Sequence, residues 1–428
     1  MKYLTMIKNN TIYVSTYIIS LLFSFNIFFW GITYNFIQLR FLIFLLLIPL
    51  IINLNKFFFC KILKYALISI LVFLHLYLQS NVFIYNSLFF ILGFFLLLII
   101  FDYYQNFFFE NINKIINLFI FFFILFIIIQ FILQFKNLED MSSRAICVGC
   151  FSDYRMFFLE NSHLAYVAPS VVFYLAFIAN YRMFNFFLII FFTVIAFVNS
   201  SLTLYFGLIL LVFFTILFKI KSNNFQKIFL ILITIAVLNS YLWNPGARIK
   251  LLDVPSSINL QLSDKKYFET INENSFTTIQ EFNKNRDINN RINLSSEIFR
   301  TSLIIAKKAL FNKPLGYGFN NYNEAFEQFI NEVEIYNWET RGLNIKDASN
   351  NFSKIVTEFG IFSLFFFYFI ISFFLSKKID NKIKIFLILP IIIQLFIRGS
   401  GYFNGGFVLF SFYALNLWLK NYKTSHIN

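Results

Sequence analysis

Long apolar segments separated by short polar loops occupy most of this 428-residue chain. The segments fall at 11–34, 36–54, 61–79, 83–101, 115–135, 164–180, 184–199, 200–220, 227–243, 354–376, 382–397 and 402–420. Most come near the ~20 apolar residues that a helix needs to cross a bilayer. The pattern predicts an all-α polytopic integral membrane protein with about 12 transmembrane helices, although 184–220 also fits one long broken span.

One long polar stretch interrupts this pattern and divides the chain into three parts. Residues 1–243 form a predicted membrane bundle of about nine helices, with an outer loop at 137–163. Residues 244–353 form one large extracytoplasmic loop that contains an amphipathic helix, and 354–428 return to the membrane as about three helices. A polar excursion of about 100 residues is where such a protein would place chemistry or recognition.

Positive charge sets the expected orientation. Lysine and arginine concentrate on one set of alternate loops, at Lys2, Lys8, Lys56, Lys61, Lys64, Lys114, Arg182, Lys219, Lys221, Lys227, Lys377, Lys378, Lys382, Lys384, Lys420 and Lys423. Because cytoplasmic loops are enriched in these residues, we expect both termini in the cytoplasm, and 137–163, 244–351 and 398–406 outside. Much of the net charge of +14 is then topological, and it does not predict nucleic-acid binding. With 59% hydrophobic and 13% charged residues, a soluble domain is excluded.

The cysteines do not predict a metal centre. Cys147 and Cys150 form a CxxC in the first outer loop, without a second pair or histidines at ligand spacing. They fit either a local disulfide in an oxidising compartment or two incidental thiols. We therefore expect neither a metal nor a cofactor.

The first outer stretch with candidate chemistry is 158–165. It places Glu160 and His163 at the outer end of a predicted transmembrane helix. A partly desolvated carboxylate or imidazole there could act as a general base, since burial and neighbouring charges tune both towards neutral pKa values. The alternative is a polar cap that marks the water boundary.

The second stretch runs from 294 to 322. Its apolar positions predict a helix that lies on or dips into the membrane surface: Ile298, Phe299, Leu303, Ile304, Ala306, Leu310 and Phe311. Arg300 and Lys307 share a face of this helix, which suits a phosphate group. Pro314, Gly316 and Gly318 then break the helix, and the glycines would let backbone N–H groups approach an anionic or sugar ligand. A plain turn is the alternative.

The third stretch, 341–360, enters a predicted membrane helix from outside. Asp347 and Asn350 precede the helix, and Glu358 lies about two turns inside it, where an ionisable residue is costly and indicates a functional site. A glycine-rich turn follows Arg398. The outer segments carry several arginines, among them Arg144, Arg155, Arg300, Arg341 and Arg398. Arginines that the charge bias does not require outside suggest binding of an anionic lipid head group.

Together these residues resemble the bacterial O-antigen polymerases of the Wzy type and, more distantly, the O-antigen ligases. The run E-N-S-H-L-A at 160–165 is similar to the family's E-P-S-H-x-A, with Asn161 in place of proline. Residues 300–318 are similar to a family signature in which an arginine and a helix are followed by a motif of proline and two glycines, here Pro314, Gly316 and Gly318. Residues 349–360 are similar to the family's H-N-x-x-L…E-x-G motif. The R-G-S-G-Y-F turn at 398–403 is similar to the C-terminal region of the polymerases.

The resemblance implies a GT-C-like glycosyltransferase in the bacterial inner membrane. Its donor would be a growing glycan on undecaprenyl pyrophosphate and its acceptor a new lipid-linked repeat unit, with a chain-length regulator and a flippase as pathway partners. Catalytic roles fall to Glu160, His163, Arg300 and Arg398, and substrate-binding roles to Arg144, Gly316, Gly318, Arg341, Asp347 and Asn350. Arg300, Arg341 and Arg398 would hold the departing pyrophosphate. Glu160 or His163 would take the acceptor's proton, with Asp347 in reserve.

Two other functions fit part of the pattern. A ligase that transfers finished glycan to lipid A core would share the fold and donor, but Ser349 stands where ligases carry histidine. A flippase or secondary transporter would favour internal repeats, mid-membrane charges and short outer loops. The sequence instead has one dominant outer loop and few charges within its apolar segments.

Overall fold

The computed structural model describes residues 56–79, 85–135, 165–179, 202–222, 224–243, 294–333, 343–399 and 401–423. Within these ranges the chain is helical, with turns between the helices and no strand. Each predicted apolar segment that falls within them contains a helix, which confirms the all-α class. The predicted segments 11–34, 36–54 and 184–199 lie outside the described residues.

The helices follow the hydropathy closely. In the N-terminal part they are α4 (Lys56–Gln79), α5 (Tyr85–Glu110), α6 (Ile112–Phe135), α8 (Ala168–Phe177), α10 (Leu202–Leu217) and α11 (Asn224–Trp243). The polar region contributes α15 (Leu294–Asn312), α16 (Tyr322–Phe329) and the 3₁₀ turn η4 (Ile330–Glu332). The C-terminal part contributes α17 (Asn351–Phe359), η6 (Gly360–Phe362), α18 (Ser363–Leu375), α19 (Asn381–Phe396) and α20 (Phe407–Lys423).

Within the residues that the structure describes, three helical segments are long and apolar enough to cross a membrane: Phe59–Gln79, Ile91–Glu110 and Asn351–Leu375. The chain is therefore membrane-associated. On α4 a stripe of large apolar side chains is exposed at helical spacing, namely Phe59, Leu63, Leu67, Ile70, Leu71, Leu74 and Leu78. Such a stripe suits contact with lipid. The count of about 12 spans and the GT-C-like fold stay predictions.

Helix α19 lies at the centre of the apolar helix bundle. It packs against α8, α10, α17 and α20, and most of its side chains are buried. Aromatic contacts join the neighbours, as where the Phe386 and Phe410 rings lie 5.9 Å apart. Helices α8 and α10 approach closely at Gly207, where an added Cβ would lie 2.6 Å from Pro169 Cγ.

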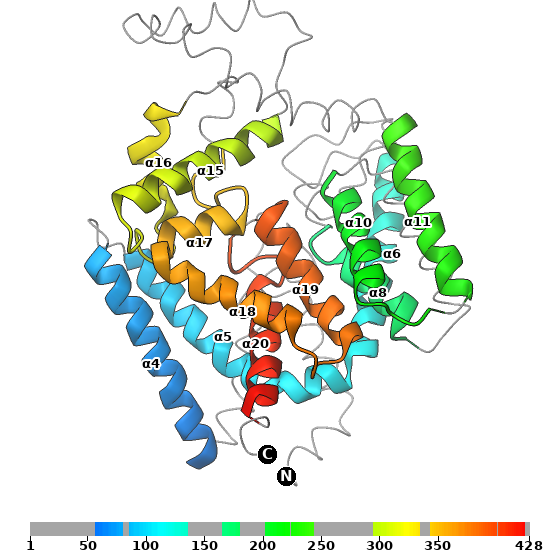
Figure 1. The fold of residues 1–428 in the computed structure, drawn as a ribbon, viewed down its shortest axis with the longest axis horizontal. Coiled ribbons are helices and arrows are strands. Elements are labelled where there is room, and N and C mark those ends of the chain that lie inside the picture. Colours follow the sequence, from blue (N-terminus) through cyan, green and yellow to red (C-terminus); the bar gives the residue numbers. More distant parts are fainter. Residues whose placement is uncertain are drawn as a thin grey trace, which may run out of the picture.

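Helices α15, α16 and α17 pack together near one end of the molecule, drawn in yellow-green to orange (Figure 1), and α17 also packs on α19. This group is named the outer cluster after the side of the membrane on which the sequence predicts it. The helix predicted for the polar region is α15, and it is amphipathic. Ile305 and Ala309 are buried against the cluster, whereas Leu303 and Phe311 are exposed. Much of its apolar face therefore packs on protein, and a smaller part is free to meet the membrane surface.

Candidate functional site

The start of α17 joins two of the predicted site segments. Asn350 caps this helix, because its Oδ1 accepts a hydrogen bond from the Ser353 N–H at 2.8 Å. Its Nδ2 donates to Ser302 Oγ on α15 at 2.9 Å. Arg300 lies two residues before Ser302, so the buried Asn350 fixes the Arg300 segment against the start of α17.

The glycine-rich turn after Arg398 packs on the same helix start. The Gly399 N–H donates to Ser349 O at 2.8 Å, and the Gly401 N–H donates to Asn351 Oδ1 at 3.1 Å. Side chains are excluded here, since a Cβ on Gly399 would lie 2.6 Å from Asn351 N. A Cβ on Gly401 would lie 2.9 Å from Asp347 Oδ1. Asp347 and the Arg398 turn are therefore neighbours.

Arg300 and Arg398 flank one short segment, residues 349–351. The Arg300 side chain is only 10% exposed, and its Nη2 lies 3.9 Å from Oε1 of Glu297, which is fully buried. Arg398 is half-buried. The structure thus brings Arg300, Asp347, Asn350 and Arg398 into one neighbourhood, through segments that are far apart in the sequence.

The loop with Pro314, Gly316 and Gly318 packs closely against the backbone at Glu358, and this close approach requires its glycines. The Gly316 N–H donates to Lys313 O at 2.8 Å, and the Gly318 N–H donates to Glu358 O at 2.9 Å. Both glycines have positive φ, and a Cβ on Gly316 would overlap the carbonyl of Glu358. In the structure both N–H groups donate within the fold, and a substrate-binding role for Gly316 and Gly318 stays a prediction.

Glu358 ties three segments together in a fully buried polar cluster. Its carboxylate accepts hydrogen bonds from the Asn320 N–H at 2.8 Å, the Tyr322 N–H at 3.3 Å and the Tyr402 hydroxyl at 2.6 Å. It also pairs with Lys354 Nζ at 2.7 Å. The charge that the sequence placed within an apolar helix is thus matched inside the protein, and it joins α17 to the proline–glycine loop and the Arg398 turn.

Two residues of this region were missed from the sequence. Lys354 is buried, donates to Lys346 O at 2.6 Å and lies 5.3 Å from the centre of the Tyr402 ring. Its i, i+4 spacing from Glu358 was the available signal. His75 on α4 hydrogen-bonds the Leu315 carbonyl at 2.7 Å through Nε2 and stacks on Phe359 at 5.6 Å. Nothing near His75 in the sequence indicates that partner.

Four predicted site residues lie outside the described residues: Arg144, Glu160, His163 and Arg341. Cys147 and Cys150 lie there too, so their pairing stays open. The two candidate bases, Glu160 and His163, stay predictions. Within the ranges given above, no group of three or more histidine, cysteine or acidic side chains could hold a metal ion.

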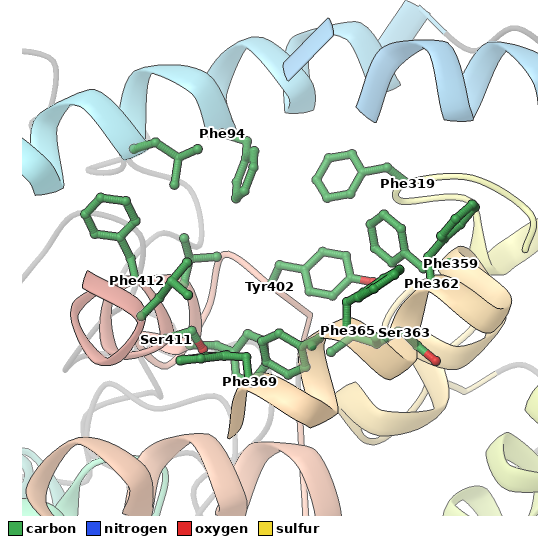
Figure 2. A pocket seen from close by; sticks show the side chains of 16 residues that line it. Phe94, Phe319, Phe359, Phe362, Ser363, Phe365, Phe369, Tyr402, Ser411 and Phe412 are labelled. Atoms are coloured by element: carbon green, nitrogen blue, oxygen red, sulfur yellow. The ribbon is translucent and has the colours of Figure 1, made fainter. Parts of the chain in front are cut away.

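Beneath the cluster lies an apolar cavity of about 370 Å³ (Figure 2). Helices α5, α17, α18 and α20 supply most of its walls, through Phe94, Leu98, Ile355, Phe359, Phe366, Phe369, Val408, Ser411, Phe412 and Leu415. The rings of Phe319 and Tyr402 also line it and stack in parallel, with centroids 5.5 Å apart and an interplanar angle of 8°. These two residues come from the proline–glycine loop and from the Arg398 turn.

No protein-family model, curated protein or solved structure matches this chain.

Proposed function

We propose that this chain is a Wzy-type O-antigen polymerase in the bacterial inner membrane, with a GT-C-like fold and both termini in the cytoplasm. It would transfer the growing glycan from undecaprenyl pyrophosphate to a new lipid-linked repeat unit at the periplasmic face, alongside a chain-length regulator and a flippase. One observation carries this proposal. Of the three segments that resemble the family, 349–360 contains helix α17, and 300–318 and 398–403 both pack against its start or its side.

The chemistry requires one base and one site for a leaving anion. The acceptor hydroxyl attacks the anomeric carbon of the donor glycan, a new glycosidic bond forms, and the bond to the pyrophosphate oxygen breaks. Negative charge grows on the pyrophosphate, where guanidinium groups stabilise it by paired, charge-assisted hydrogen bonds. We assign Arg300 and Arg398 to this task, supported by Arg341, and the acceptor's proton to Glu160 or His163, with Asp347 in reserve.

The surroundings of Arg300 favour this assignment. At 10% exposure its guanidinium is largely removed from water, and electrostatic interactions in such surroundings are stronger than in bulk solvent. The separation of 3.9 Å from the buried Glu297 exceeds hydrogen-bond length. At this distance Glu297 interacts with the guanidinium electrostatically and helps to orient it.

The environment of Ser349 supports a polymerase over a ligase. Ser349 occupies the position of the ligase histidine, is 1% exposed and has a backbone φ of 61°. Its carbonyl accepts the Gly399 N–H. Ser349 therefore connects the segment before α17 to the turn after Arg398, and its short side chain supplies no base.

The test is the lipopolysaccharide ladder of a strain that lacks this gene and expresses plasmid-borne variants. Arg300→Ala and Arg398→Ala should each remove the long chains, leaving a core with one repeat unit, while protein accumulates normally. The exposed Lys377, in the turn between α18 and α19 and away from this site, gives the control cation, and Lys377→Ala should keep the ladder.

The other outcomes contradict the proposal in distinct ways. A core without any repeat, with polymer accumulating on the lipid carrier, would indicate a ligase. An unchanged ladder in the deletion strain would favour a transporter. A normal ladder in both arginine variants would remove the pyrophosphate role while leaving the reaction open to other residues.

A further inference from the structure

The apolar cavity beneath the outer cluster is suited to a hydrocarbon ligand. Of its lining residues only Ser363, Ser411 and Tyr402 carry polar side-chain atoms, and the Tyr402 hydroxyl already donates to Glu358. Phenylalanine rings from several elements face the space in Figure 2. Because a polar ligand would lose its hydrogen bonds to water without replacement here, the occupant must be almost wholly apolar.

The position of the cavity indicates the source of that ligand. Its walls belong in part to two of the membrane-crossing segments, Ile91–Glu110 and Asn351–Leu375. Two lining residues, Phe362 and Phe365, are 45% and 73% exposed, so the cavity reaches the apolar surface of the helix bundle. At this depth the surrounding solvent is lipid, and a chain can enter sideways from the bilayer.

The roof of the cavity links it to the candidate site. Phe319 follows the proline–glycine loop, and Tyr402 belongs to the turn that begins at Arg398. Ile355 lies four residues after Asn351 on α17, about 6 Å along the helix axis. A lipid with its chain in the cavity would therefore hold its head group close to the segment that Arg300 and Arg398 flank.

We propose that this cavity binds the first isoprene units of a polyisoprenoid carrier lipid, the part of the chain next to its pyrophosphate. The proposal rests on the function proposed above, because that reaction brings a polyprenyl pyrophosphate to these arginines. A bulk phospholipid has no comparable reason to keep its head there. Tyr402 would have two tasks: its ring contacts the chain, and its hydroxyl holds the roof to Glu358.

The experiment uses the full chain in lipid nanodiscs and a polyprenyl phosphate probe with a photoreactive diazirine in its first isoprene units. Irradiation should label peptides from α18 or α20, and mass spectrometry locates the site. Ser411→Trp fills the cavity from α20 and should reduce labelling by about tenfold or more. Leu375→Trp adds the same ring at a position on α18 that is 67% exposed, and its labelling should match that of the wild type.

Competition separates the two sources of apolar chain. Excess unlabelled polyprenyl phosphate should abolish the labelling, and the same excess of phosphatidylethanolamine should not. Equal competition by both lipids would overturn the proposal, as would full labelling of Ser411→Trp. If Ser411→Trp does not accumulate, Val408→Phe replaces it, because Val408 lines the same wall with a smaller change of volume.

The readout keeps this inference separate from the proposed reaction, because binding is measured without polymerisation. Labelling in the cavity together with an unchanged ladder in the deletion strain would keep the lipid site and remove the polymerase. A lost ladder without labelling in the cavity would keep the polymerase proposal and remove the lipid site.

Discussion

Glu358 and Lys354 illustrate how one buried ion pair can organise three segments. Each is less than 3% exposed, and together they contact residues of the proline–glycine loop, the segment before α17 and the Arg398 turn. Removing one partner leaves the other charged and buried, which typically costs about 3–5 kcal/mol. Replacing both partners costs less, because no unmatched charge remains.

Glu358→Ala should therefore destabilise the detergent-solubilised protein by about 3–5 kcal/mol, measured as a lower midpoint of thermal aggregation. The double variant Lys354→Met with Glu358→Leu should lose less stability than the sum of the losses in the single variants Lys354→Met and Glu358→Leu. Additive losses would mean that the two side chains act independently, contrary to the 2.7 Å contact.

Tyr317 provides a pH-dependent test of the outer cluster. Its hydroxyl lies 2.7 Å from Gln328 Oε1 and 3.1 Å from Asn312 Oδ1, and burial together with the nearby Glu324 raises its pKa from 10.0 to about 12. The folded state thus retains the proton longer than the unfolded state. Its stabilisation is complete below pH 10 and is lost as pH rises through about 12.

Tyr317→Phe should lower stability at neutral pH by about 0.5–1.5 kcal/mol, the usual value of a hydrogen bond. It should also make the decline in stability between pH 10 and 12 less steep than in the wild type. Thermal unfolding across that range measures both effects. Parallel pH profiles would show that Tyr317 does not titrate with unfolding.

The helices themselves follow from the sequence, but the interruption between α17 and α18 does not. The apolar run 354–376 fits one continuous span, whereas the structure turns at Gly360, where φ is 52°. The cause lies far away in the chain: a Cβ on Gly360 would overlap the carbonyl of Pro314, and the Ile361 N–H donates to that carbonyl at 2.8 Å. Periodicity reports local preference and carries no information on such distant contacts.

The candidate site, like the fold, was predictable in its residues but not in its tertiary contacts. Arg300, Asp347, Asn350 and Arg398 were identified as outer residues, and their segments do lie together. The backbone contacts of Gly316 and Gly318 with Glu358 could not be predicted, because a glycine that approaches a ligand and one that approaches another backbone give the same sequence pattern. The pairing of Lys354 with Lys346 and Tyr402 depends on tertiary contacts that no local pattern contains.

Gly316 and Gly360 should both be intolerant of a side chain. Gly360→Ala introduces an atom that overlaps backbone at a positive φ, so we expect a loss of several kcal/mol or failure to accumulate. Gly93 on α5 is the matched control, since nothing lies within 4 Å of its added Cβ. Gly93→Ala should be neutral or stabilising by up to about 1 kcal/mol. The yield and the thermal stability of each variant in detergent measure these effects. If Gly360→Ala and Gly93→Ala were equally well tolerated, the close backbone contact at Gly360 would be contradicted.

The two ends of α4 can be used to determine which way the molecule is oriented in the membrane. Cys60 is exposed near its start, while His75 and Gln79 contact the outer loop near its end. The 15 helical steps from Cys60 to His75 span about 22 Å. If the outer cluster faces the periplasm, Cys60 must therefore lie towards the cytoplasm.

Thiol labelling of intact cells tests this orientation after Cys147 and Cys150 are replaced by serine. A membrane-impermeant maleimide should leave Cys60 unlabelled until the cells are opened. A Lys307→Cys variant, at an exposed position of α15, should react before that. The opposite pattern would reverse the predicted topology and place the outer cluster in the cytoplasm.

The spacing of Lys354 and Glu358 also bears on how the chain enters the membrane during synthesis. The segment Asn351–Leu375 emerges from the ribosome before Tyr402 exists, so the last hydrogen-bond donor to Glu358 is made after that segment meets the insertion machinery. A single charge at the centre of an inserting helix costs roughly 2.5–3.5 kcal/mol. One turn apart on the same helix, Lys354 and Glu358 can neutralise each other before any other segment arrives. On this physical argument we expect the pair that later fastens the outer cluster to neutralise itself while its own helix inserts.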